Sequence, residues 1–321
     1  MRRVTLASAA LTLSTIAAQA GGAGAADFAA ANAITAPTLV ACTLSDGSEA
    51  ECLKLVTSFP AEAFRIGPFC PETFDDTGGL WVWDGDNPGT YRLDGAFFRM
   101  LSEQGYTFYD ADGVINISDP GSGQRPEGNT CLEAMLDTDV ETTVLIPTEP
   151  RMADAATDLG TVALVGIALD GVPIFADAPS VLETGHLPAL DTCGGHVDPG
   201  GYYHWHATAT DIETALAHED VAADCDHETS PSDLFGYAYD GYAMYGSADI
   251  DGTVPDNLDQ CSGHVGMTAE SDTPVYHYHA SETFPNLPTC LAGVTARDNF
   301  VTNAAMGIGA QNGRRTPPPP Q

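Results

Sequence analysis

The stretch GIALDGVPIF at residues 166–175 returns as GYAYDGYAMY at residues 236–245, and this repetition decides how the chain must be built. Two further pairs of blocks follow in the same order: LDTCGGHV matches LDQCSGHV, and YHWHA matches YHYHA. Ordered self-similarity of this kind is the signature of a duplicated structural unit. We predict a unit made of a strand, a turn and a strand, then a loop with Cys and His, then a strand with His-x-His.

The duplication predicts a mostly β fold that is stabilised by disulfides and has few short helices. Two copies of one unit usually pack about a pseudo-two-fold axis. We therefore expect one inseparable domain over residues 140–300, with repeats at about 160–230 and 231–295. Residues 26–139 contain short strand-like segments divided by Gly, Asp and Pro, and they form either a flanking sheet or a small separate domain.

Three further segments have their own local signals. One helix is expected near residues 96–104 and another at 211–220. Residues 301–321, which end in a proline run, are expected to be a disordered tail. Residues 1–25 read as a secretory signal peptide, because Arg2 and Arg3 precede an apolar run with small residues near its end, and cleavage is expected after Ala20 or Ala25.

The net negative charge of the chain argues against two classes of binding partner. It carries 45 acidic residues against 11 Lys and Arg, a formal charge of −34. Such a surface repels nucleic acid and anionic membranes, so neither is an expected partner. No apolar run after the leader approaches the roughly 20 residues that a membrane span needs. We expect a secreted or periplasmic protein, with protein partners not indicated.

The cysteines support export. Eight cysteines in an exported chain predict up to four disulfides. There is no Cys-x-x-Cys motif, so structural bridges are favoured over catalytic thiols. Eight cysteines allow 105 connectivities, and the sequence does not fix which one forms. Local spacing suggests the pairs Cys42 with Cys52, Cys70 with Cys131, Cys193 with Cys225, and Cys261 with Cys290.

Two pairs of histidines stand two residues apart between aromatic residues: His204 and His206 in YYHWHA, and His277 and His279 in VYHYHA. In a strand, residues i and i+2 point to the same face, with Cα atoms about 6.6 to 7 Å apart. Both imidazoles of a pair can therefore reach one metal ion. The alternating aromatic residues point to the opposite face, where burial would hold the pair rigidly.

Each copy adds a third histidine, His196 or His264, in a Cys-x-Gly-His-Val loop. Three imidazoles suit zinc or copper. If the two His-x-His strands are neighbours, their four histidines could instead form a single site, and the sequence leaves both arrangements open.

Two acidic residues recur beside these motifs. Asp170 and Asp240 occupy the same place in both copies. They are candidate acceptors for ring N–H groups next to a metal, although Asp-Gly is first of all a tight-turn signal. His186, His218 and His227 lie outside the repeat and are expected on the surface.

A metal-free interpretation is also open. A lone histidine on a strand is usually a core or surface residue, and a hydrogen-bonded network of Tyr, His and Asp needs no ion. Here six of the nine histidines fall at equivalent places in two copies, which favours metal binding.

The stretch from Ile146 to Gly293 resembles the YHYH domain family, exported proteins named for the motif that stands here at Tyr276-His277-Tyr278-His279. The segments that carry the resemblance are GIALDGVPIF, GYAYDGYAMYG, LDQCSGHV, VYHYHA and FPNLPTCLAG. The first copy has Trp205 where the second has Tyr278, which keeps the residue aromatic. The resemblance implies export and a presumed metal site, and it implies no defined activity.

We therefore expect an exported protein that binds one or two copper or zinc ions through His196, His204, His206, His264, His277 and His279. Metal binding without catalysis is the first hypothesis. A metalloenzyme is the second, either a copper redox enzyme or a zinc hydrolase with Asp170 or Asp240 as base. A structural or interaction module without metal is the third. No substrate or catalytic residue is indicated.

Overall fold

The computed structural model describes residues 22–28, 32–60, 65–124, 127–208, 210–212, 225 and 230–311. Most of the expected leader, most of the helix expected at 211–220, His218 and His227 lie outside these residues. Within the described part, strands predominate and helices are short. Ala23 is buried in the main core, so of the two expected cleavage points only the one after Ala20 keeps it in the protein.

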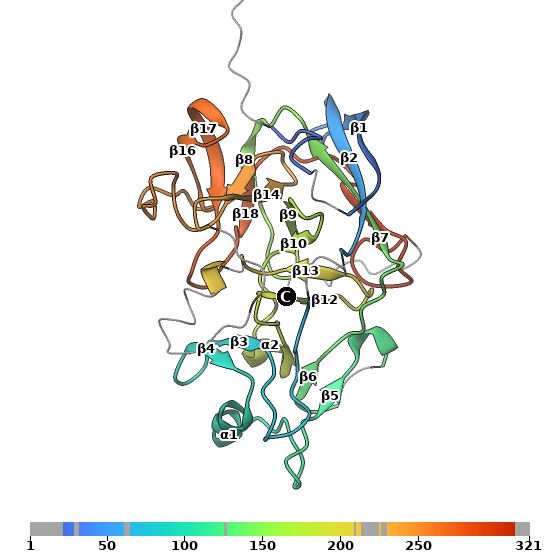
Figure 1. Cartoon of the computed structure of the whole chain (residues 1–321), viewed down its shortest axis with the longest axis vertical. Coiled ribbons are helices and arrows are strands. Elements are labelled where there is room, and N and C mark those ends of the chain that lie inside the picture. Colours follow the sequence, from blue (N-terminus) through green and yellow to red (C-terminus); the bar gives the residue numbers. More distant parts are fainter. Residues whose placement is uncertain are drawn as a thin grey trace, which may run out of the picture.

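The centre of the molecule is an eight-stranded sheet, and each of the two repeats contributes four of its strands (Figure 1). Within each repeat an antiparallel pair is followed by a hairpin that carries the histidines, and the pair and hairpin meet in parallel, β10 with β13 and β15 with β17. In spatial order the strands are β12 (Gly195–Val197), β13 (Tyr203–Trp205), β10 (Pro173–Phe175), β9 (Leu164–Ala168), β14 (Leu234–Ala238), β15 (Ala243–Tyr245), β17 (Ser271–His279) and β16 (Gly263–Thr268).

The two repeats meet where β9 pairs antiparallel with β14. Gly166 lies opposite Ala238, and Gly236 lies opposite Ala168, so equivalent residues exchange places across the pair. A Cβ on Gly166 would lie 2.2 Å from the Tyr237 carbonyl oxygen, and the other glycine is as tightly placed. Glycine is therefore required at both positions. This order and register are what a local two-fold axis between β9 and β14 would produce, and the axis itself stays a prediction.

A second sheet joins the N-terminal region to the repeats. Its strands in order are β1 (Ala33–Thr43), β2 (Glu49–Ser58), β7 (Glu141–Pro147) and β19 (Phe300–Thr302). Residues 33–58 thus flank the expected domain instead of standing apart from it. The tail expected from residue 301 was wrong at its start, because β19 pairs with β7 and Phe300 is buried against Phe175. Residues 312–321 lie outside the described part.

Buried residues between Cys70 and Cys131 pack with Ala178, Val181, Leu187 and Ala189 around a second hydrophobic core at the lower end of Figure 1. The helix α1 (Gly95–Glu103) lies where the sequence predicts one, and Asp94 caps it by accepting from the N–H groups of Ala96 and Phe97. The remaining elements are β3 (Leu80–Trp83), β4 (Gly89–Arg92), β5 (Ile117–Ser118), η1 (Pro120–Ser122), β6 (Thr130–Leu132), β8 (Met152–Asp158), α2 (Val181–Thr184), β11 (His186–Pro188) and β18 (Cys290–Gly293).

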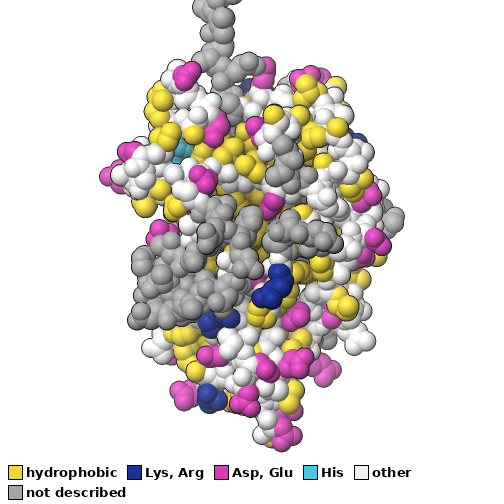
Figure 2. Space-filling model, in the orientation of Figure 1, with side chains coloured by type: hydrophobic (Ala, Val, Ile, Leu, Met, Phe, Trp, Pro, Cys, Tyr) yellow, Lys and Arg dark blue, Asp and Glu magenta, His cyan; other side chains and the backbone are white. Residues whose placement is uncertain are grey.

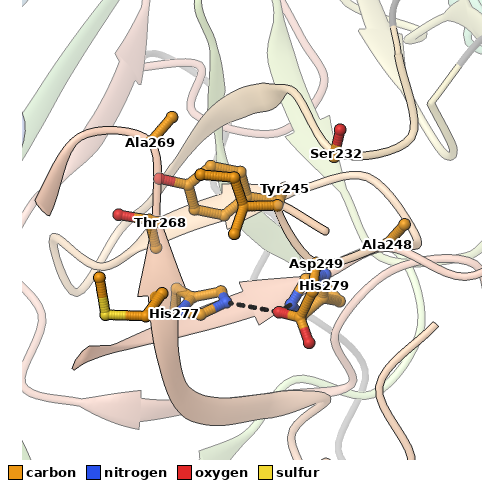
Figure 3. A pocket seen from close by; sticks show the side chains of 10 residues that line it. Ser232, Tyr245, Ala248, Asp249, Thr268, Ala269, His277 and His279 are labelled. Carbon is orange, nitrogen blue, oxygen red and sulfur yellow. Dashed lines mark ion pairs between the residues drawn. The ribbon is translucent and has the colours of Figure 1, made fainter. Parts of the chain in front are cut away.

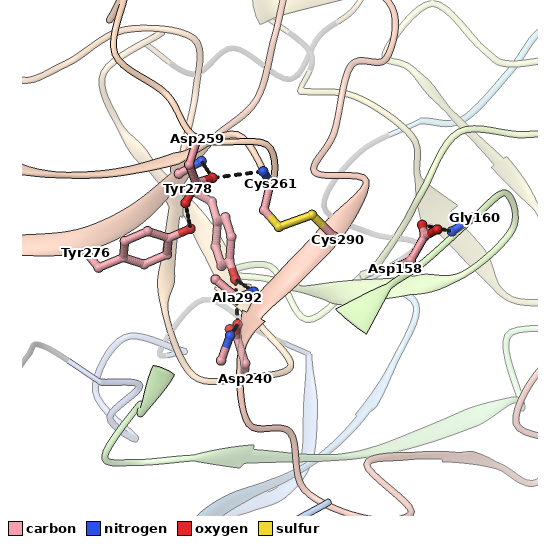
Figure 4. Close-up of a disulfide and its surroundings, with 11 residues drawn as sticks. Asp158, Gly160, Asp240, Asp259, Cys261, Tyr276, Tyr278, Cys290 and Ala292 are labelled. Carbon is pink, nitrogen blue, oxygen red and sulfur yellow. Dashed lines mark hydrogen bonds between the residues drawn. A yellow bond between two sulfur atoms is a disulfide. The ribbon is translucent and has the colours of Figure 1, made fainter. Parts of the chain in front are cut away.

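All eight cysteines form disulfides, and the pairs are those suggested by local spacing: Cys42–Cys52, Cys70–Cys131, Cys193–Cys225 and Cys261–Cys290. The last of them joins the loop before β16 to the start of β18 (Figure 4). Acidic side chains are scattered over the face seen in Figure 2, with few Lys or Arg among them. Among the described residues, no helix is long and apolar enough to cross a membrane.

Candidate metal centre

The first histidine cluster is built by the hairpin β12–β13. His196 pairs directly with His204 across the hairpin, and His206 follows at the end of β13. The Nε2 atom of His206 lies 3.0 Å from that of His204 and 3.1 Å from that of His196. His204 and His206 are each 2% exposed, and Phe175 stacks on the His204 ring with centroids 4.2 Å apart.

The second cluster is built in the same way by β16–β17, with His264 opposite His277. The Nε2 atom of His264 lies 3.1 Å from that of His277 and 3.3 Å from that of His279. Asp249 adds a carboxylate: its Oδ1 atom lies 3.1, 3.7 and 3.5 Å from the Nε2 atoms of His264, His277 and His279. Figure 3 shows Asp249 facing the two histidines of β17.

The four ligand atoms of the second cluster fit a tetrahedral ion. A zinc ion with ligands at 2.0 to 2.1 Å places neighbouring ligand atoms about 3.3 Å apart. The five distances of 3.1 to 3.7 Å bracket this value. The donor set also suits copper, since imidazole binds both metals.

In the second cluster the N–H groups of the histidine rings point away from the centre of the cluster. Nδ1 of His277 lies 3.0 Å from the Val275 carbonyl oxygen, and Nδ1 of His279 lies 2.8 Å from that of Gly246. A carbonyl only accepts, so each Nδ1 carries the hydrogen and each Nε2 lone pair faces the centre. Asn257 Oδ1 lies 2.9 Å from Nδ1 of His264 and supports the same tautomer. Lone pairs that converge with a carboxylate oxygen repel one another unless a cation lies between them.

The rings of the first cluster have less regular support. Burial lowers the pKa of His204 and His206, and the carbonyls at the equivalent positions, those of Tyr202 and Ala176, only oppose this lowering. Neither Nδ1 atom has a hydrogen bond of regular geometry, however. The two clusters therefore have the same arrangement of rings, and the rings of the second cluster have the more regular hydrogen bonds.

Burial keeps the rings neutral. Desolvation lowers the pKa of His196 and of His279 to about 4, and it lowers the pKa of His204 and His206 well below the usual value. The pKa of His277 is also lowered, first by burial. A neutral imidazole is the form that binds a metal, so these five rings are ready ligands at neutral pH.

The four-histidine site that the sequence left open does not form. Four strands, β10, β9, β14 and β15, separate β13 from β17 in the sheet. At about 4.8 Å per strand, the two His-x-His strands lie roughly 24 Å apart along the sheet. The six histidines therefore divide into two clusters, one per repeat.

The two recurring Asp-Gly carboxylates accept from backbone N–H groups within their turns, as the turn signal predicts, and they also bond to the aromatic face of the motif strands. Asp170 Oδ2 accepts from Trp205 Nε1 at 3.2 Å, and Asp240 Oδ2 accepts from the Tyr278 hydroxyl at 2.5 Å (Figure 4). Each carboxylate thus holds the central aromatic residue of a His-x-His motif. The alternation of a strand places that residue opposite the histidines.

Another pair of carboxylates was missed, although both lie in the repeated Leu-Asp-x-Cys blocks. Asp191 accepts from the N–H groups of Cys193 and Gly195 and from the hydroxyl of Tyr203. Asp259 accepts in the same way from Cys261, Gly263 and Tyr276. Each bonds the Cys-x-Gly-His loop to the aromatic side of the neighbouring strand. The repetition of this Asp in both blocks was the signal that could have revealed it.

Asp249 was also missed, and the duplication hides it. Aligned without gaps, residues 166–180 and 236–250 place Pro179 opposite Asp249, so no recurrence marks Asp249.

Beside the second cluster lies a cavity of about 10 Å³, lined among others by Tyr245, Thr268 and His279 (Figure 3). That is about the space one water molecule needs.

His186, expected on the surface, is half-buried, with its Nδ1 atom 3.4 Å from the Thr130 hydroxyl, and it takes no part in either cluster.

Comparison with known families gives a match over part of the chain. Residues 143–255 match the family model described as YHYH protein. The match includes YYHWHA and Asp249, and it ends before VYHYHA at residues 275–280. No curated protein and no solved structure matched the chain.

Proposed function

Residues 143–255 carry a domain of the YHYH family, and from this premise we propose that the chain is an exported protein that binds transition metal ions, copper or zinc, at its two histidine clusters. The ligands are His196, His204 and His206 in the first cluster, and Asp249, His264, His277 and His279 in the second. Four disulfides support export, since such bonds persist in oxidising compartments.

One observation carries the proposal. In the second cluster two Nδ1 atoms are bound to carbonyl oxygens, so their Nε2 lone pairs face a carboxylate and a third ring at 3.1 to 3.7 Å. A hydrogen-bonded network without metal would need a donor for each of these contacts. Burial lowers the pKa of His277 and His279 and so removes the imidazolium that could supply one. A bound cation satisfies all four atoms together.

The metalloenzyme has less support than metal binding alone. The cavity beside the second cluster has room for about one water molecule. Asp170 and Asp240, the candidate bases, are engaged by Trp205 and Tyr278 on the opposite face of the strands. A structural metal or a storage site fits these features better than hydrolysis.

The test is elemental analysis by mass spectrometry of protein purified from the medium or periplasm without a chelator or a histidine tag. We expect copper or zinc at one or two ions per chain. The His277→Ala, His279→Ala double variant should lose the ion of the second cluster and keep the fold, because both side chains lie opposite the aromatic core.

The matched control is His186→Ala, which removes a half-buried histidine outside both clusters. Its metal content should equal that of the wild type. Wild-type protein that takes up neither Cu(II) nor Zn(II), and whose Tm does not rise with either, would contradict the proposal, because a ligand that binds the folded state must stabilise it.

A further inference from the structure

The two clusters differ at one position of an otherwise repeated set. The second has Asp249, whose Oδ1 atom lies within 3.7 Å of all three Nε2 atoms. The first has Pro179 at the equivalent position. In the part of the chain that the structure describes, no carboxylate joins the first cluster. The second cluster thus has one negative charge among its ligands, and the first is a set of neutral rings.

The surroundings strengthen this contrast. Phe175, which is fully buried, stacks on His204 in the first cluster. The equivalent residue in the second is Tyr245, whose hydroxyl donates to the Glu270 carboxylate. Asp249 places a carboxylate oxygen within 3.7 Å of all three rings of the second cluster, whereas the first cluster has the aromatic ring of Phe175 against His204. The first cluster is the more apolar of the two.

An ion in an apolar site is costly in proportion to the square of its uncompensated charge. A divalent ion in the second cluster is reduced to a net single charge by Asp249. The same ion in the first cluster would keep both charges. A monovalent ion in the first cluster gives a net charge of one, the same as a divalent ion together with Asp249 in the second cluster. Copper is the metal suited to imidazole that also has a stable monovalent form.

On the proposed metal-binding function, we infer that the clusters take different ions: the second holds a divalent cation, zinc or Cu(II), and the first holds monovalent copper. The ions are bound without change of oxidation state. The first cluster supplies three imidazole nitrogens, and the Nε2 atom of His206 lies 3.0 and 3.1 Å from those of His204 and His196. Imidazole is a ligand suited to copper.

The test uses the full exported chain, stripped of metal and handled without oxygen. It is incubated with excess Zn(II) and with Cu(I) supplied from a chromophoric chelator, freed of unbound ions by gel filtration, and analysed for both elements. We expect one zinc and one copper per chain, with the copper in the monovalent state by X-ray absorption. Two zinc ions per chain, or two copper ions and no zinc, would overturn the inference.

Paired variants assign the ions to their clusters. Asp249→Asn should lower the zinc affinity by more than about 100-fold, beyond what loss of an outer partner costs, and should leave the Cu(I) affinity unchanged. The His204→Ala, His206→Ala double variant should lose the copper and keep the zinc. Pro179→Asp should allow a second zinc ion. Equal loss of both metals in Asp249→Asn would contradict the assignment.

The two proposals fail in different ways. A wild-type chain that binds neither ion refutes metal binding as a whole. A chain that binds the same ion at both clusters, with similar affinity, keeps the proposed function and refutes only the difference between the clusters.

Discussion

Asp191 shows how single side chains hold the histidine loops. Its carboxylate is 1% exposed and accepts from three backbone N–H groups, those of Gly67, Cys193 and Gly195, and from the Tyr203 hydroxyl. Burial is the largest influence and raises its pKa from 3.8 to about 6, against the lowering effect of these donors. The loop that carries His196 is therefore tied to a carboxyl group whose ionisation opposes folding.

This produces a defined pH dependence. Because the folded-state pKa of Asp191 is above the unfolded value, its contribution to stability is complete below about pH 3.8 and is lost as the pH rises through about 6. The shift corresponds to about 3 kcal/mol. Asp191→Asn cannot titrate, so relative to this variant the wild type should lose about that free energy of unfolding between pH 3.5 and 7.5. Urea denaturation of metal-free protein at several pH values measures the difference.

Asp259→Asn is the matched control, because Asp259 has the same three kinds of donor but an exposed side chain. An equally large change in that variant would contradict burial as the cause. A difference between wild type and Asp191→Asn that does not vary with pH would contradict the raised pKa itself.

The central strands β9 and β14 decide how the two repeats join. Their backbones approach so closely that an added Cβ on Gly166 or Gly236 would lie 2.2 or 2.3 Å from a carbonyl oxygen of the partner strand. Both contacts are with backbone, which cannot turn aside as a flexible side chain can. The shared sheet therefore depends on two glycines that recur in the repeat.

We expect Gly166→Ala and Gly236→Ala each to lower the free energy of unfolding by about 1 to 3 kcal/mol, the usual cost of overpacking. Their equivalent positions predict similar values, and chemical denaturation measures them. Since each cluster is built within its own hairpin, both variants should still bind metal while folded. Unchanged stability in both would show that the strands can separate without cost.

The residues that match the family model depend for their core on strands that lie outside the match. The matched residues 143–255 omit β17, which pairs with β15 and contributes the fully buried Tyr278. They also omit β2 and β19, the two neighbours of β7. A fragment of this extent would expose two sides of the core.

We therefore predict that a fragment of residues 143–255 does not unfold cooperatively, whereas a chain of residues 22–311 keeps the Tm of the mature protein. Differential scanning calorimetry distinguishes the two, with the longer chain as the control for truncation. A sharp transition in the fragment would show that the first repeat folds alone and would contradict the expectation of one inseparable domain.

Much of the design could be read from the residues. The duplicated blocks predicted strands, and the period of two placed each histidine pair on one face with aromatic residues on the other. The cysteine count predicted up to four disulfides, and local spacing suggested the pairs without fixing them. The strands and their two faces depend on local backbone geometry, which neighbouring residues along the chain set. The disulfides do not, because Cys70 and Cys131, for example, are 61 residues apart. The roles of Asp191 and Asp259 could also have been predicted from the sequence, because both residues recur at the same place in the repeat.

Other features depend on which distant segments meet. The separation of the histidines into two clusters follows from strand order, because four strands come to lie between β13 and β17. Asp249 joins the second cluster because a loop after β15 passes the end of β17, and Pro179 in the first copy conceals that role. β19 pairs with β7 at the edge of the second sheet, where Phe300 packs in the core beside Phe175. Long-range packing fixes such contacts, and a pattern of neighbouring residues does not encode them.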